Sequence, residues 1–221
     1  MNYQIIPVLD AAEVARVLRA LEAHPFVDGK ATAGGIARDV KQNLQAEREG
    51  DSLSALDQLV ISALQRNEVL QAFAFPKRLR PPIFARYEPG MEYGAHVDGA
   101  IMNDHGSLLR ADLAVTLFLS SPETYDGGEL VIELPYGEEE IKLEAGEAVV
   151  YPADTVHRVA PVTRGARIVA VTWVQTAVQD ERMRTLLFDL YRTIGKVEAG
   201  EDPRLLLSKT YHNLLRITAE F

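Results

Sequence analysis

Two histidines, one aspartate and one arginine are the residues whose types and spacing could carry chemistry in this chain. His96 and Asp98 are separated by one residue, and residues two apart in a strand point to the same face. An imidazole and a carboxylate placed in this way can bind one metal ion side by side. His157 follows later in the chain, and Arg167 lies ten residues beyond it. The chain has no cysteine, so a metal here would be held by histidine, carboxylate or water.

The order of these four residues is more informative than any one of them. Singly, His96 or His157 is better explained as a core histidine, and Arg167 as a rim residue paired with an acidic side chain. Two histidines and a carboxylate on one face of a metal, with open positions opposite, are typical of non-haem Fe(II) oxygenases. An arginine offers a planar, permanently charged fork that binds a carboxylate in a bidentate manner. The set as a whole therefore favours a metal site.

Strand alternation predicts that Arg167 points into the fold. It would share a strand face with Val169, Val171 and Trp173, so its charge would lie among apolar neighbours. An unpaired charge there would be unfavourable, and an anionic ligand would remove that cost.

The elements that must position these residues are predicted to be strands. Between Pro81 and Val174, short runs rich in β-branched and aromatic residues alternate with turn signals, at spacings typical of a sandwich or barrel. The runs are Ile83–Tyr87, Leu113–Leu119, Glu129–Leu134, Glu140–Leu143, Ala148–Tyr151, His157–Val162 and Arg167–Val174. The connections are too short for crossover helices, so the sheets should be mostly antiparallel. We expect a mainly β fold with flanking helices, built on a double-stranded β-helix (jelly roll) core.

Helical patterns occupy both ends of the chain. Asp10 and Glu13 form a capping-box pair before an apolar stripe at helical spacing, and a second helix fits Ser54 to Asn67. Asn67 can cap a short third helix. Two further stripes, over 183–190 and 205–217, predict a small C-terminal helical extension. We therefore expect a jelly-roll domain with N-terminal helices over residues 1–176 and the extension over 177–221.

Composition narrows the function classes. Of 221 residues, 47% are hydrophobic and 25% charged, and the formal net charge is −9. This mix can form a packed core. The acidic balance argues against nucleic-acid or anionic-membrane partners. We found neither a signal-peptide pattern nor an apolar run near the ~20 residues of a spanning helix, so we expect a cytoplasmic protein.

The same residues resemble a known family. His96-Val97-Asp98, His157 and Arg167, in that order, resemble the Fe(II)/2-oxoglutarate-dependent dioxygenases, and more narrowly the prolyl-4-hydroxylase-like PKHD-type hydroxylases of bacteria. The resemblance is dense from Phe84 to Trp173 and thinner in the helical N-terminus. Its further motifs are Arg86-Tyr87-Glu88-Pro89-Gly90, Tyr125-Asp126-Gly127-Gly128-Glu129-Leu130, Gly146-Glu147-Ala148, Tyr151-Pro152 and Gly165-x-Arg167 with Trp173.

The resemblance implies a set of roles and cofactors. His96, Asp98 and His157 would ligate Fe(II), and Arg167 would bind the distal carboxylate of 2-oxoglutarate. Tyr87 would be a second co-substrate contact, unless it is simply a buried strand aromatic. The implied activity is hydroxylation of a peptide, amino acid or other small molecule by O2, with release of succinate and CO2. L-Ascorbate (vitamin C) would serve as reductant, and no catalytic residue is implied beyond the metal site.

Other functions stay open from the sequence. A cupin-like metal-dependent enzyme that does not use 2-oxoglutarate would share the jelly roll and a histidine-rich site. A non-catalytic jelly roll that senses iron or binds a small ligand would share them too. The substrate cannot be read from the sequence, although loops over 99–109 and 120–126 should influence its choice. A homodimer through the terminal helices is a further expectation.

Overall fold

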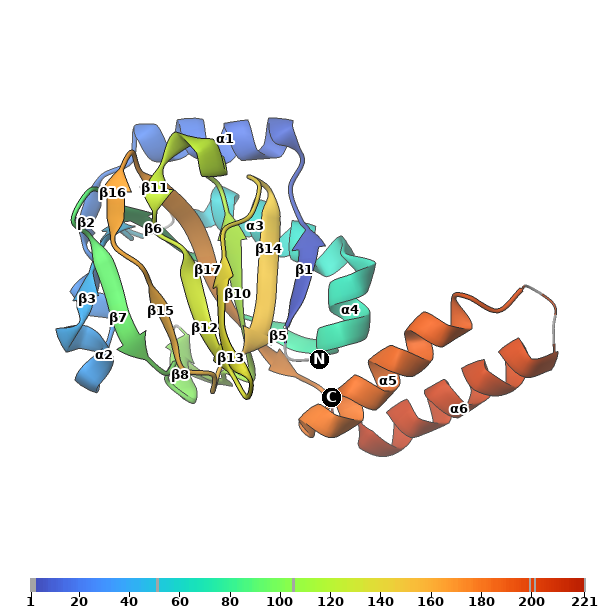
Figure 1. Ribbon diagram of the computed structural model, residues 1–221. Helices are drawn as coiled ribbons and strands as arrows, with labels where there is room; N and C mark the ends of the chain where they lie inside the picture. The colour runs from blue at the N-terminus through green and yellow to red at the C-terminus, as the bar shows by residue number, and fades with distance from the viewer. Residues whose placement is uncertain (1–2, 51, 105, 199, 201, 221) are drawn as a thin grey trace.

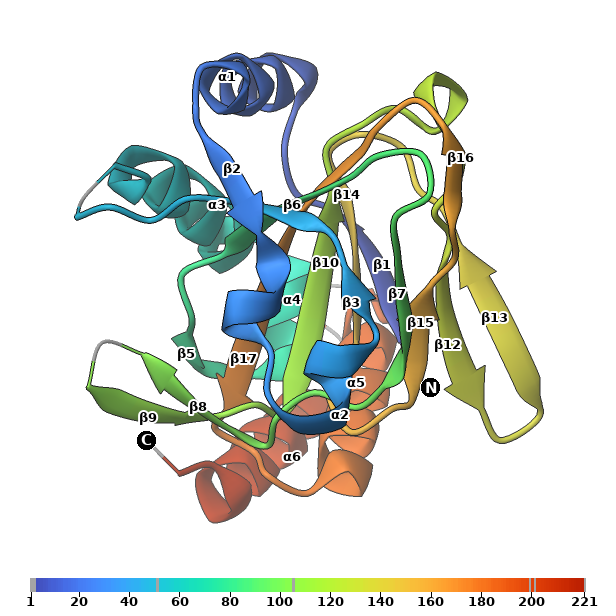
Figure 2. The same cartoon turned by 90° about the vertical axis from the view of Figure 1, so that its left-hand side faces the viewer.

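Two facing antiparallel sheets, with helices against the outer face of the larger one, make up the body of the molecule (Figure 1 and Figure 2). The computed structural model describes residues 3–50, 52–104, 106–198, 200 and 202–220. Every strand pairing recorded within these ranges is antiparallel. The predicted double-stranded β-helix is thereby confirmed.

The larger sheet has the strand order β1-β14-β10-β17-β6-β4-β2, and β5 also pairs with β17. The bounds of its strands are β1 Gln4–Pro7, β2 Phe26–Asp28, β4 Leu44–Ala46, β5 Pro76–Leu79, β6 Ile83–Tyr87, β10 Leu113–Phe118, β14 Glu147–Pro152 and β17 Arg167–Thr176. The predicted strands over β6, β10, β14 and β17 are confirmed to within two residues at each end. These strands carry the apolar runs that the sequence pattern detects best.

The smaller sheet has the order β13-β12-β15-β7-β3, and two short ribbons flank it, β8 with β9 and β11 with β16. The bounds are β3 Lys41–Gln42, β7 Glu92–His96, β8 Ile101–Asp104, β9 Ser107–Arg110, β11 Asp126–Gly127, β12 Leu130–Leu134, β13 Gly137–Ile141, β15 His157–Val159 and β16 Val162–Arg164. The single strand predicted over His157–Val162 is wrong. It divides into β15 and β16 because Pro161 lies between them and has no N–H for a ladder.

Six α-helices and two short 3₁₀ turns lie within the described ranges. They are α1 Ala11–Glu22, η1 Gly29–Thr32, α2 Gly35–Asp39, α3 Ser54–Arg66, α4 Glu68–Ala74, η2 Pro122–Thr124, α5 Glu181–Ile194 and α6 Asp202–Thr218. The predicted capping box forms, since Asp10 accepts from the Glu13 N–H at 2.8 Å and Glu13 returns a bond to the Asp10 N–H. Asn67 caps α4 by accepting from the Leu70 N–H at 2.9 Å.

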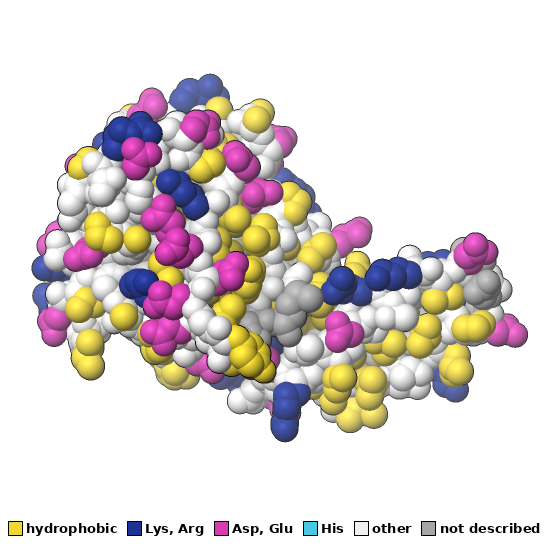
Figure 3. All heavy atoms as spheres, in the orientation of Figure 1, with side chains coloured by type: hydrophobic (Ala, Val, Ile, Leu, Met, Phe, Trp, Pro, Cys, Tyr) yellow, Lys and Arg dark blue, Asp and Glu magenta, His cyan; other side chains and the backbone are white. Residues whose placement is uncertain are grey.

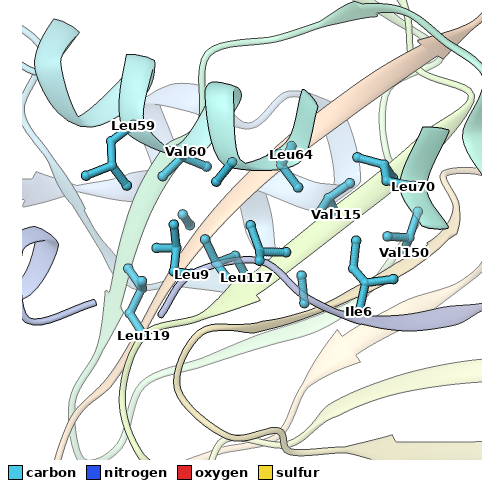
Figure 4. Close-up of a cluster of buried hydrophobic side chains, with 14 of the residues drawn as sticks. Ile6, Leu9, Leu59, Val60, Leu64, Leu70, Val115, Leu117, Leu119 and Val150 are labelled. Atoms are coloured by element: carbon cyan, nitrogen blue, oxygen red, sulfur yellow. The ribbon is translucent and has the colours of Figure 1, made fainter. Parts of the chain in front are cut away.

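Apolar side chains fill both sides of the larger sheet. On its outer face, α1, α3 and α4 cover β10, β14 and β17. Figure 4 shows leucines and valines of α3 and α4 on one side, and Ile6 of β1 with leucine and valine side chains of β10 and β14 on the other. A second cluster, between the two sheets, includes Phe118, Ile132, Tyr151 and Val169. The sheet that carries Arg167 is thus held rigidly from both faces.

Helices α5 and α6 form a hairpin that projects from the body (Figure 1). Phe75, Ala177, Val178 and Leu187 make the buried cluster at its base. The division of the chain at residues 176 and 177 stays a prediction. No helix among the described residues is long and apolar enough to cross a membrane.

Candidate metal centre and co-substrate pocket

The two predicted histidines are direct neighbours across a strand pair. In the antiparallel pair β7–β15, His96 lies opposite His157, and their ring centroids are 4.3 Å apart. Asp98 lies just beyond the end of β7, so the expectation that both residues share one strand is wrong. The turn nevertheless brings Asp98 Oδ1 to 4.0 Å from His96 Nε2 and 3.9 Å from His157 Nε2. The three atoms can therefore share one metal ion.

Both imidazoles are oriented by the backbone of their own strands. His96 Nδ1 lies 2.8 Å from the Gly94 carbonyl oxygen, and His157 Nδ1 lies 2.9 Å from the Thr155 carbonyl oxygen. A carbonyl oxygen can only accept, so each Nδ1 carries a proton, which leaves each Nε2 as the nitrogen that can bind a metal. This is the tautomer that a metal requires, and such partners typically orient metal-ligating histidines.

Trp173 holds the other oxygen of the carboxylate. Its indole Nε1–H donates to Asp98 Oδ2 at 2.8 Å, which leaves Oδ1 facing the imidazoles. Trp173 belongs to β17 of the larger sheet, while the histidines belong to the smaller one. The bond therefore links the two sheets at the metal centre. The sequence placed Trp173 on the inner face but contained no signal for this contact.

Burial and neighbouring charges shift the ionisation of the cluster. Burial, together with the nearby His157, lowers the pKa of His96 to about 4. Burial raises the pKa of Asp98, while His157, Trp173 and Lys41 oppose that rise. A low histidine pKa keeps the imidazole neutral, which is the form that coordinates metals.

Arg167 is a buried cation that lies against aromatic rings. Its side chain is 1% exposed and lies over the rings of Tyr87 and Phe118, at 5.1 and 5.3 Å from the centroids. Its Nε is buried without a hydrogen-bond partner, and among the described residues no carboxylate lies within 4.0 Å of the guanidinium. Tyr87 lies directly opposite Arg167 in the β6–β17 pair. The predicted inward orientation is confirmed, and the arrangement can bind an anion.

One cavity of about 490 Å³ contains all five predicted residues, a size typical of small-molecule sites. The loop over 99–109 contributes Gly99, Ile101, Met102 and Asn103 to its wall. Residues 120–126, all of which the structure describes, contribute none, so their expected influence on substrate choice is not supported. His105, which belongs to the same loop, lies outside the described residues.

A polar wall of this cavity was missed by sequence reasoning. It consists of Thr32, Lys41, Asn43 and Gln45, from η1, β3 and β4. The alternation Lys41-x-Asn43-x-Gln45 was the available signal, because it places three polar side chains on one strand face. Strands this short lack the apolar runs by which strands are usually detected.

Comparisons with known proteins agree with this geometry. The 2OG-Fe(II) oxygenase superfamily model matches residues 82–175. A PKHD-type hydroxylase of Methylobacterium nodulans is 46% identical over 219 residues, with 96% of each chain covered. One of Synechococcus elongatus is 45% identical over 223 residues, with 100% of each covered. The chain belongs to the PKHD-type hydroxylases.

Solved structures support the fold of this PKHD-type hydroxylase. A Pseudomonas putida prolyl-4-hydroxylase has a TM-score of 0.53 at 23% identity, covering 79% of this chain and 92% of that chain. A prolyl hydroxylase of Trichoplax adhaerens has a TM-score of 0.57 at 19% identity, covering 84% and 86%. The family is one of Fe(II)- and 2-oxoglutarate-dependent enzymes. Two imidazoles and a carboxylate fit Fe(II), and the buried Arg167 fits a dicarboxylate.

Proposed function

We propose that this PKHD-type hydroxylase binds Fe(II) through His96, Asp98 and His157, and hydroxylates a substrate at the expense of 2-oxoglutarate. The observation that carries the proposal is the convergence of His96 Nε2, Asp98 Oδ1 and His157 Nε2 in the cavity that also contains Arg167, whose buried Nε has no hydrogen-bond partner. The overall reaction converts a C–H bond, O2 and 2-oxoglutarate into C–OH, succinate and CO2. The iron, when bound, supplies the activation of oxygen.

The protein supplies orientation and charge. Arg167 binds the distal carboxylate of 2-oxoglutarate, and the rings of Tyr87 and Phe118 beside it keep that end of the cavity dry. Water exclusion strengthens the ion pair, because charges attract more strongly at low dielectric. Tyr87 is the second contact for the co-substrate. With the distal carboxylate held at Arg167, the 2-oxo acid end is directed toward the histidines.

The identity of the metal ligands also bears on the reaction type. Asp98 retains a carboxylate where halogenase relatives have a small residue, which favours hydroxylation. We further propose that L-ascorbate restores iron that has been oxidised in turnovers without substrate. A requirement for ascorbate would be tested by following succinate formation over repeated turnovers with and without it.

An anaerobic titration tests the proposal directly. Addition of 2-oxoglutarate to the Fe(II)-loaded protein should produce a visible metal-to-ligand charge-transfer band, because the 2-oxo acid chelates the iron. Arg167→Ala should shift the titration to much higher 2-oxoglutarate concentrations without loss of bound iron. Bound iron with no band in the wild-type protein would contradict the proposal. It would favour a cupin-like enzyme or an iron sensor instead.

A further inference from the structure

The inner face of one short chain segment is polar where a jelly roll is usually apolar. Residues 41–46 cross from the smaller sheet, where β3 pairs with β7, to the larger sheet, where β4 pairs with β6. Along this crossing Lys41, Asn43 and Gln45 alternate toward the cavity, and each is only 5% exposed. Burying polar groups is unfavourable unless they gain partners. Thr32 bonds both Gln45 and Lys41, whereas Asn43 Oδ1 is buried without a hydrogen-bond partner.

Lys41 is the charged member of the wall. Its Nζ donates to Thr32 Oγ1 at 3.0 Å and lies 5.2 Å from the centroid of the Tyr93 ring. Within the described part of the chain, no carboxylate lies within 4.0 Å of Nζ. Burial lowers the pKa of Lys41 to about 8, although Asp98 and Asp28 oppose that shift. An ammonium group has three donors, and the one recorded side-chain bond leaves others for a ligand.

Lys41 and Arg167 serve different regions of the cavity. In the smaller sheet, β15 lies on one side of β7 and β3 on the other. Arg167 lies toward the β12 side, because a Cβ built on Gly128 would come within 3.0 Å of its Cδ. Lys41 lies on the opposite side of β7. There Gly94 of β7 has no side chain, so the chain at Val40 can pack closely against the strand. The metal ligands thus lie between the two cations, which leaves Lys41 outside the co-substrate region.

The charges of the cavity do not balance without another anion. Asp98 is the one acidic side chain among the described residues that line it, whereas Lys41 and Arg167 are buried cations with no carboxylate of those residues within 4.0 Å. In the proposed complex, Asp98 and the two carboxylates of 2-oxoglutarate neutralise Fe(II) and Arg167. The charge of Lys41 is then left without a partner in a buried site. A substrate anion would supply the missing charge.

We propose that Lys41 is the substrate-recognition residue of this enzyme, and that it binds a carboxylate group of the substrate. The inference rests on the proposed function. Thr32 holds the ammonium in place, and Ile101 and Met102, which line the same cavity, offer apolar surface for the body of the substrate. The substrate is therefore a carboxylic acid with an apolar portion, such as an acylated amino acid or the C-terminal residue of a peptide.

Matched neutral and anionic probes test this assignment. Under anaerobic conditions, the Fe(II)·2-oxoglutarate complex is titrated with N-acetyl-L-amino acids and with the corresponding N-acetyl amino-acid amides. Acetylation prevents chelation of the iron by the amine. We expect acids with apolar side chains to perturb the charge-transfer band and to give calorimetric binding, and the amides to give neither.

Variants separate recognition from a structural role. Lys41→Gln should weaken acid binding by at least about tenfold, the loss typical of one charge-assisted hydrogen bond. It should leave the 2-oxoglutarate titration unchanged, and Lys41→Arg should restore part of the affinity. Lys77→Gln removes an exposed lysine on β5 and should change neither titration.

Three results would overturn the assignment. They are equal binding of acids and amides, unchanged acid binding in Lys41→Gln, and no response to any acid while the band is intact. Absence of the band itself would contradict the proposed function, so the two failures are distinguishable.

Discussion

Each oxygen of Asp98 has its own partner, and this division is the most specific feature of the site at the scale of single residues. Oδ1 faces both histidines, while Oδ2 accepts from the Trp173 indole. The carboxylate is thus oriented before any metal binds. Removal of a hydrogen-bond partner that orients a metal ligand typically weakens metal binding by about 10–100-fold.

Trp173→Phe should therefore weaken Fe(II) binding by about tenfold or more, because the phenyl ring fills most of the space but cannot donate to Oδ2. Competition with a chelator of known affinity, under anaerobic conditions, would measure the change. Tyr151→Phe is the matched control, since it removes a hydroxyl from another aromatic residue of the cavity. Equal affinities in the wild-type and Trp173→Phe proteins would show that Oδ2 needs no partner.

At the scale of the elements, the sequence predicted β17, which carries Arg167, better than β7, which carries His96 and lies outside the seven predicted runs. β6, β10 and β17 contain long apolar runs, and their boundaries were close to those observed. β3 and β4 were missed because strands of two and three residues lack the apolar runs by which strands are usually detected. Arg167 and the histidines were found from their order along the chain. Lys41 was not found, because its position against β7 depends on a long-range pairing.

The glycine turn before β12 leaves space for Arg167. Gly128 has φ +69°, and a Cβ there would lie 2.9 Å from Val162 Cγ2 and 3.0 Å from Arg167 Cδ. Gly128→Ala should displace the guanidinium and raise the 2-oxoglutarate concentration at half-maximal charge-transfer absorbance several-fold. Gly50→Ala is the control, since Gly50 has φ +52° with nothing within 4 Å. A similar change in both variants would indicate general strain instead of a local clash.

Asp112 joins the start of β10 to the end of β17. It accepts from Arg110 Nε at 2.6 Å, and from the backbone N–H and the hydroxyl of Thr176 at 2.8 and 3.0 Å. Burial alone would raise the pKa of Asp112, but these hydrogen bonds lower it below the ordinary 3.8. The ionised carboxylate therefore stabilises the fold above about pH 4. That contribution is lost as the pH falls through the lowered pKa.

Asp112→Asn should consequently reduce the free energy of unfolding by about 2 kcal/mol at neutral pH. The difference from the wild-type protein should shrink below pH 4, where Asp112 itself becomes protonated. Urea denaturation at several pH values would measure both effects. Asp154→Asn, at an exposed turn, should change stability by less than about 0.5 kcal/mol throughout. A pH-independent difference would mean that the charge of Asp112 does not contribute.

At the scale of the whole molecule, the α5–α6 hairpin is apolar on two sides. Its inner side packs Tyr211, Leu214 and Leu215 against the cluster that contains Leu187. Other hydrophobic side chains of the hairpin face solvent, and Figure 3 shows several of them together on one face. Leu205 and Leu206 are 72% and 61% exposed. Exposed apolar patches of this kind typically mark contact surfaces.

We therefore expect the homodimer that the sequence analysis anticipates to form through this hairpin. Leu205→Ser combined with Leu206→Ser should convert a dimer to a monomer in sedimentation equilibrium. Tyr136→Ser, which removes a fully exposed aromatic residue from the β12–β13 turn, should not. The monomeric variant should keep the charge-transfer band, because a single chain supplies every proposed metal and co-substrate residue. A monomeric wild-type protein would contradict the dimer, whereas a variant that lost both the dimer and the band would show that assembly supports the site.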